Sequence, residues 1–163
     1  MPDWMVHVAV AWTLCRVLRF RHTQFDTPNT ILVMVGSLMP DVVKIVMLFN
    51  TMGHDWWSYI YALHQPLGSF LVAAFACLFF EKKRDVFLFF SLGVLSHYAL
   101  DLFLLQISGG LYLFFPFNWI CFSLDLVPND DYTITVVALG VALLVYVLGR
   151  WVEKKQDFLG VTN

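Results

Sequence analysis

The stretch SHYALD, residues 96–101, lies inside an apolar run over residues 86–106. The run is long enough for a membrane-spanning helix, on which His97 and Asp101 would project from one face, about 6 Å apart along the axis. Ionisable side chains are costly inside lipid, and their usual explanation is function. The alternative is a buried histidine that hydrogen-bonds a carboxylate and locks two helices together. This stretch alone fits both explanations equally well.

The composition of the whole chain indicates the same apolar environment. Of the 163 residues, 60% are hydrophobic and 13% are charged, and the mean hydropathy is +0.72. These values predict a small integral membrane protein with one domain. The net charge of -2, without a basic stretch interleaved with aromatic residues, argues against a nucleic-acid partner.

Five apolar segments are long enough, or nearly so, to cross a hydrocarbon core of about 30 Å. They cover residues 4–20, 30–49, 56–80, 86–106 and 132–149. We therefore predict an all-α, polytopic membrane helix bundle of about five transmembrane helices. A single helical domain is expected over residues 1–150, followed by a short cytoplasmic tail over residues 151–163.

The positive charges predict the orientation of this bundle, because Lys and Arg gather in cytoplasmic loops. Three clusters close the first span, join the third to the fourth and follow the fifth: Arg16, Arg19 and Arg21; Lys82, Lys83 and Arg84; Arg150, Lys154 and Lys155. All three fall on one side if the N-terminus is outside. We therefore expect a multi-pass protein of the cytoplasmic membrane.

The long connection over residues 107–131 is expected to lie at the outer surface. Pro116 argues against a single spanning helix here. Aromatic residues suit the membrane interface, and this connection is rich in them: Tyr112, Phe114, Phe115, Phe117, Trp119 and Phe122. We interpret it as a lid or re-entrant segment over the outer helix ends. A plain aromatic belt fits the composition equally well.

Most acidic residues stand just before apolar runs or among basic residues, where helix capping or charge pairing explains them. Asp41 and Asp101 lie inside predicted spans instead, and Asp125 lies in the predicted lid. At about 1.5 Å per residue, five residues from four predicted helices fall in the outer half of the bilayer: His7, Asp41, His64, His97 and Asp101. Pro40 and Pro66 adjoin two of them and mark backbone irregularities that are tolerated beside a cavity.

Three imidazoles and two carboxylates are the ligand set of zinc or another divalent transition metal. We therefore predict a metal site made of His7, Asp41, His64, His97 and Asp101. Asp41 or Asp101, whichever does not bind the ion directly, would act as the catalytic base or orient a ligand histidine. Lys44 follows Asp41 on the same helix face, where it would neutralise that carboxylate or contact an anionic substrate.

The motifs resemble, in order, those of the YdjM-type membrane-bound metal-dependent hydrolases. They are PDWMVH (2–7), GSLMPD (36–41), HQPLGS (64–69), HYALD (97–101) and LFFPF (113–117). The resemblance covers roughly residues 2–120 and implies a metal site at the same five residues. Gln65 and Ser69 in the central motif, with Lys44, are assigned to substrate binding or to support of the ligands. The ligand order is also remotely similar to that of bacterial zinc phospholipase C, which hints at phosphoester chemistry.

Two positions depart from the family pattern. Val43 stands where a second acid is often found, which argues against a two-metal centre, and Gln65 stands where the family often has serine. Both departures put hydrolytic activity in doubt. The hypothesis is nevertheless a metal-dependent hydrolase, with zinc as cofactor and a lipid ester or phosphoester as substrate. The alternatives are a small transporter or proton relay that uses the same ionisable layer, and a structural protein in which that layer is a hydrogen-bonded pin.

Overall fold

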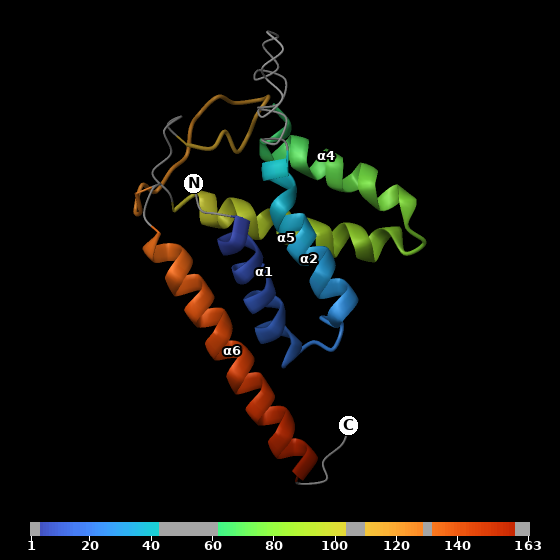
Figure 1. Cartoon of the computed structure of the whole chain (residues 1–163). Coiled ribbons are helices and arrows are strands. Elements are labelled where there is room, and N and C mark those ends of the chain that lie inside the picture. Colours follow the sequence, from blue (N-terminus) through green and yellow to red (C-terminus); the bar gives the residue numbers. More distant parts are fainter. Residues whose placement is uncertain (1–3, 43–61, 104–109, 129–131, 159–163) are drawn as a thin grey trace, which may run out of the picture.

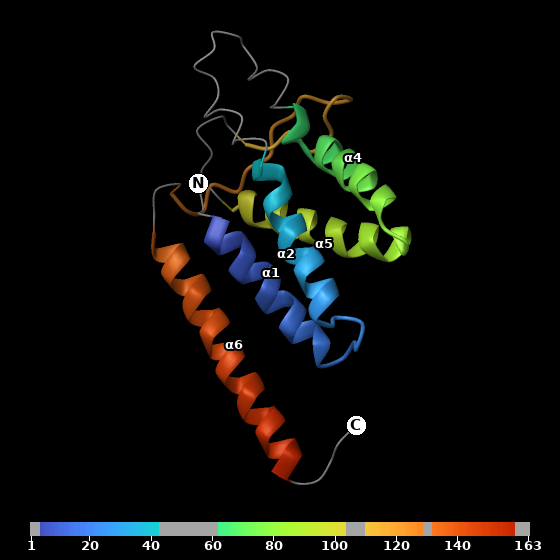
Figure 2. The same ribbon diagram turned by 45° about the vertical axis from the view of Figure 1, so that its right-hand side comes forward.

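The protein is all-α in the part of the chain that the computed structural model describes, which comprises residues 4–42, 62–103, 110–128 and 132–158. Its elements are α1 (Trp4–Arg19), α2 (Thr27–Val42), α4 (Pro66–Ala76), the short 3₁₀ helix η2 (Cys77–Phe79), α5 (Lys83–Asp101) and α6 (Thr133–Phe158). In both views, α1 lies between α6 and α2, and α5 crosses behind α2 (Figures 1 and 2).

The starts of the first two helices follow the sequence closely. The predicted helix at residue 4 is confirmed as α1. Asp26 caps α2 as expected, because its carboxylate accepts a hydrogen bond from the backbone amide of Asn29 at 3.0 Å. Pro28 lies in the first turn, where its missing N–H costs no helical hydrogen bond. The predicted end of this helix, at residue 49, lies outside the described residues.

The third predicted span, residues 56–80, is wrong as one continuous helix. The chain turns at His64 and Gln65, and α4 starts afresh at Pro66. Proline disfavours the helical conformation in the residue before it, and Gln65 is accordingly extended, with φ −78° and ψ 156°. His64 therefore lies in the turn that precedes α4 and not inside a continuous helix.

The last helix is longer than predicted and continues through most of the expected cytoplasmic tail, to Phe158. Within its segment Thr133–Lys155, an 18-residue window has a mean hydropathy of 2.0 and is only 11% buried. Among the described residues, it is the one helix long and apolar enough to cross a membrane by length and composition. The other membrane spans remain predictions from the sequence.

Helices α2 and α5 cross closely, and two glycines permit it. A Cβ atom on Gly36 would collide with the carbonyl oxygen of Phe90, and one on Gly93 would collide with that of Val33. Small residues at a crossing let two backbones approach closely. Residues near the carboxyl ends of α2 and α5 are thereby brought together.

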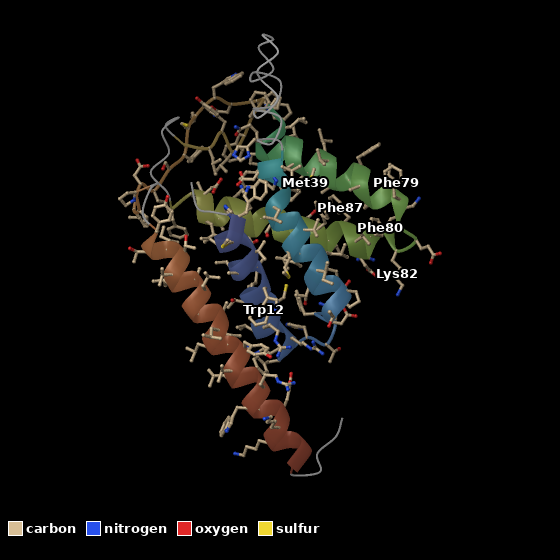
Figure 3. All side chains as sticks on the ribbon, viewed as in Figure 1. Trp12, Met39, Phe79, Phe80, Lys82 and Phe87 are labelled. Carbon is tan, nitrogen blue, oxygen red and sulfur yellow. The ribbon has the colours of Figure 1, made fainter. Side chains whose placement is uncertain are left out.

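Two apolar clusters hold the helices around this crossing. The first unites α4, α5 and the segment 110–128 through Ala73, Phe90, Val94, Tyr98 and Leu111, with Met39 and Phe87 packed against it (Figure 3). The second joins α1 to α2 through Ala11, Cys15, Phe25 and Val33. Because Leu111 is 1% exposed, the segment 110–128 is anchored in the core at one point.

Candidate metal centre

The five predicted ligands come from the ends of four separate pieces of the chain. His7 lies in the first turn of α1, Asp41 in the last turn of α2, His64 in the turn before α4, and His97 and Asp101 in the last turns of α5. The structure gathers them into two groups that share His97: His7, His97 and Asp101; Asp41, His64 and His97. Within each group, the potential ligand atoms lie within 4.8 Å of one another.

His97 is the centre of the arrangement and is completely buried. Its Nδ1 atom lies 2.8 Å from the backbone carbonyl oxygen of Ser37. A carbonyl only accepts hydrogen bonds, so Nδ1 donates and Nε2 carries the lone pair in the neutral ring. Nε2 lies 3.2 Å from Asp101 Oδ2 and 3.7 Å from Asp41 Oδ1. It makes no hydrogen bond within the described residues.

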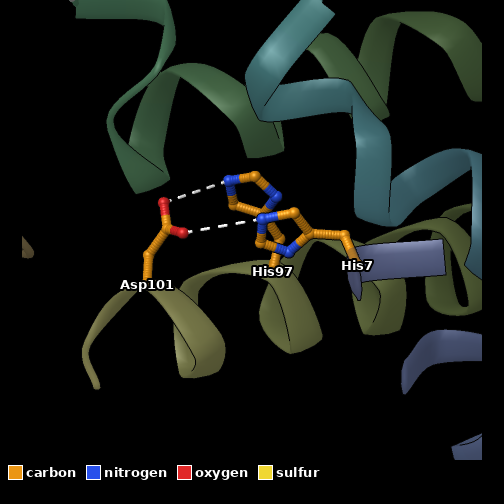
Figure 4. Close-up of side chains that lie close together, drawn as sticks. All are labelled: His7, His97 and Asp101. Atoms are coloured by element: carbon orange, nitrogen blue, oxygen red, sulfur yellow. Dashed lines mark ion pairs between the residues drawn. The ribbon is translucent and has the colours of Figure 1, made fainter. Parts of the chain in front are cut away.

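His7 brings α1 to the same place. Its ring stacks on that of His97, with centroids 3.9 Å apart and planes inclined by 20°. Its Nε2 atom lies 3.6 Å from Asp101 Oδ1. The two oxygens of Asp101 therefore face one imidazole each (Figure 4).

His64 joins the centre from the turn before α4. Its Nδ1 atom lies 2.8 Å from the carbonyl oxygen of Pro40 and 3.9 Å from Asp41 Oδ1. Pro40 is in the last described turn of α2. His64 and His97 therefore each donate Nδ1–H to a backbone carbonyl oxygen of α2, and in both neutral rings Nε2 carries the lone pair.

The residues fit a divalent cation. Ligand atoms around a tetrahedral zinc ion are about 3.4 Å apart, given bonds of about 2.1 Å. The three separations between a histidine Nε2 atom and a carboxylate oxygen run from 3.2 to 3.7 Å, whereas hydrogen bonds between charged partners are about 2.7–2.9 Å long. A lone pair on His97 Nε2 also points at two carboxylates, which is repulsive unless a proton or a metal lies between them. The spacing resembles a ligand set more than a set of hydrogen bonds.

A family model described as YdjM inner membrane protein matches residues 3–160. The chain belongs to the YdjM inner membrane protein family. The resemblance stated from the motifs is thus confirmed over nearly the whole chain, and the bilayer follows as its environment. Neither the comparison with curated proteins nor that with solved structures found a match.

In this YdjM family member, two residues that the motif analysis did not assign also support the centre. Ser37 orients His97 through its carbonyl oxygen. Tyr98 donates a hydrogen bond to the carbonyl oxygen of His64 at 2.6 Å. Ser37 lies four residues before Asp41, and Tyr98 directly follows His97. The only sequence signal for these two supporting residues is that each is a polar residue near a candidate ligand. Their contacts involve backbone carbonyl oxygens, which the sequence does not reveal.

The three predicted supporting residues have different positions. Ser69 Oγ lies 2.6 Å from the Tyr98 hydroxyl and 3.1 Å from the carbonyl oxygen of Leu63, so it braces the turn that carries His64. Gln65 is buried beside that turn. Its Oε1 atom accepts a hydrogen bond from the backbone amide of Tyr112 at 3.1 Å. Lys44 lies outside the described residues, as does Val43.

The contact between Gln65 and Tyr112 ties the predicted lid to the centre, and it gives a testable expectation. In Gln65→Leu, the Tyr112 amide should exchange its hydrogen about fivefold faster, because one hydrogen bond worth about 1 kcal/mol is lost. Hydrogen–deuterium exchange with mass spectrometry measures this. Asn118→Leu is the matched control, since the Asn118 side chain holds the amide of Ile120 within the same segment. Unchanged exchange at Tyr112 in Gln65→Leu would contradict the tie.

Proposed function

We propose that this chain is a membrane-embedded metal-dependent hydrolase. The observation that carries the proposal is the environment of His97, whose Nε2 lone pair is directed at Asp41 and Asp101 in a buried site. A divalent cation would neutralise the negative charge of the Asp41 and Asp101 carboxylates, whose burial without a counter-charge is costly. Nitrogen and oxygen donors together favour zinc among the common ions.

The proposed ligands are His7, Asp41, His64, His97 and Asp101. Because Ser37 occupies His97 Nδ1, His97 has only Nε2 to offer to the two groups that share it. This favours one ion between Asp41 and Asp101 over two separate ions. When bound, such an ion lowers the pKa of water and polarises an electrophilic carbonyl or phosphoryl oxygen of the substrate.

The protein side chains then have distinct roles. The Asp41 or Asp101 carboxylate, whichever is not needed as a ligand, takes the proton from the attacking water. Ser37 and Pro40 hold His97 and His64 in the tautomer that leaves Nε2 without a hydrogen. Gln65 Nε2 is buried and has no hydrogen-bond partner among the described residues. It is therefore a donor available to an oxygen atom of the substrate.

The proposed topology places the centre in the outer half of the bilayer. We propose about five spans with the N-terminus outside, although only α6 meets the length and composition criteria among the described helices. The three basic clusters lie at the ends of α1, α5 and α6 that are remote from the five candidate ligands. By the positive-inside rule, those ends face the cytoplasm. A centre in this position favours a lipid ester or phosphoester as substrate.

Asp41→Asn tests the catalytic assignment. The change keeps the shape of the side chain but removes its basicity, so hydrolysis should fall by about two to four orders of magnitude. The assay uses detergent-purified protein, stripped with a chelator and reloaded with zinc, on a panel of phospholipids and simpler phosphoesters, with products measured by mass spectrometry. Metal content measured in parallel shows whether Asp41 acts as base or as ligand.

Asp26→Asn is the matched control for that experiment, since Asp26 caps α2 at the far end and asparagine also caps helices. It should retain full activity. Wild-type protein that binds zinc but cleaves none of these substrates would contradict the hydrolase and favour a metal-stabilised transporter. Purified wild-type protein that contains no metal would favour the structural alternative, in which hydrogen bonds within the polar layer hold the helices together.

A further inference from the structure

An apolar groove runs between α1 and α6. Its volume is about 430 Å³, which is within the range of roughly 300–1,000 Å³ for small-molecule sites. All its lining residues except Thr13 are apolar: Val6, Val10, Thr13, Leu14, Leu100, Ile134, Val137, Ala138 and Val141. On α1 they extend from residue 6 to residue 14, which is about 12 Å along the axis.

One end of the groove lies beside the helix turns that carry two candidate ligands, although no candidate ligand lines it. Val6 and Leu100 line the groove, and each directly precedes a candidate ligand, His7 and Asp101. Ile134, at the start of α6, lines the groove too. The groove therefore leads away from the buried polar centre, along two parallel helices.

Further along the same helices, α1 and α6 contact each other directly. Trp12 projects from α1 towards α6, and its ring lies 6.5 Å from that of Tyr146 (Figure 3). Arg16 pairs with Glu153 at 3.2 Å and approaches the backbone at Gly149. These contacts lie beyond Val141, the last α6 residue of the groove.

We propose that this groove holds the acyl chain of a membrane phospholipid whose polar part lies at the metal centre. The assignment of that polar part rests on the proposed hydrolase. Burial of methylenes in an apolar groove is favourable, and the α6 wall belongs to the helix that can cross a membrane.

Ala138→Phe fills the groove and is the main test. Native mass spectrometry of delipidated protein, titrated with dipalmitoyl phosphatidylethanolamine, measures the bound lipid. Each methylene withdrawn from an apolar site weakens binding by roughly fourfold, so loss of two should weaken it by more than about tenfold. Val137→Phe, on the same wall, should act in the same direction. Dihexanoyl phosphatidylethanolamine should bind weakly to all variants.

Val136→Phe is the matched control, since Val136 is 68% exposed and does not line the groove. It should bind the long-chain lipid like wild type, with equal metal content and thermal stability in all variants. Equal lipid binding by Ala138→Phe, Val137→Phe and Val136→Phe overturns the proposal, and so does a lipid-free dimer as the main species. Lipid binding by chelated protein is independent of hydrolysis. If the protein binds lipid in a chain-length-dependent manner but hydrolyses nothing, the groove proposal holds and the hydrolase proposal fails. If it hydrolyses substrate but its lipid binding does not depend on chain length, the hydrolase proposal holds and the groove proposal fails.

Discussion

His97→Ala is expected to remove bound metal from the purified protein. His97 is the one residue common to both ligand groups among the described residues, and its Nε2 atom faces both carboxylates. Substitution of a residue that hydrogen-bonds to a metal ligand already lowers metal affinity by about 10–100-fold. Loss of the ligand His97 itself should therefore lower metal affinity by more than about a hundredfold. Elemental analysis of detergent-purified wild type and variant, after dialysis against a weak chelator, measures the difference.

His22→Ala is the control for that experiment, because His22 is exposed and lies in the turn after α1, at the far end from the centre. It should keep near-stoichiometric metal. Metal retained by His97→Ala would contradict the proposed centre. No metal in any of the three proteins, together with a lower melting temperature in His97→Ala alone, would identify the layer as a structural pin.

Gly93→Ala is expected to destabilise the protein strongly. Its new methyl group would collide with the Val33 carbonyl and would lie 2.6 Å from the Ser37 amide nitrogen. Overpacking costs about 1–3 kcal/mol, which corresponds to a melting temperature lower by about 2–12 °C for a chain of this length. Separation of α2 from α5 would also move Ser37 away from His97, so metal content should fall with stability. Thermal unfolding in detergent, followed by tryptophan fluorescence, measures the first effect.

Gly140→Ala makes the same chemical change where a Cβ atom meets nothing within 4 Å. It should leave the melting temperature unchanged or raise it slightly, because alanine is about 1 kcal/mol better than glycine inside a helix. Metal content should stay at the wild-type level. If Gly93→Ala and Gly140→Ala lowered the melting temperature equally, the small size of Gly93 would not be what permits the close crossing of α2 and α5.

The sequence predicts structure well where a short motif, such as a helix cap, is compatible with only one local conformation. Asp26 and Pro28 mark the start of α2, and the structure agrees. Pro66 was interpreted as a bend inside a span, but it begins a new helix. Hydropathy counts apolar residues without distinguishing a continuous helix from two pieces joined by a turn, so it predicts the third segment as one helix, although the chain turns before Pro66.

The five candidate ligands could be predicted because ionisable residues are rare in apolar segments and theirs lie at similar depths. Their supporting contacts could not be predicted, since Ser37 and Pro40 act through backbone carbonyl oxygens. Every residue has such an oxygen, and only the crossing of α2 with α5 and the turn at His64 bring these two to the rings. Residue type therefore indicates the candidate ligands, and tertiary packing selects their partners.

The neighbouring positions of α1 and α6 have a consequence for biosynthesis. α1 leaves the ribosome first and α6 last among the described helices, yet Arg16 pairs with Glu153 and Trp12 contacts Tyr146. α1, which carries His7, therefore lacks one of its flanking helices until synthesis of the chain is nearly finished. The helix that carries His7, a candidate ligand, is fully packed only after translation of α6, so the final packing of α1 is a late event in assembly of the protein.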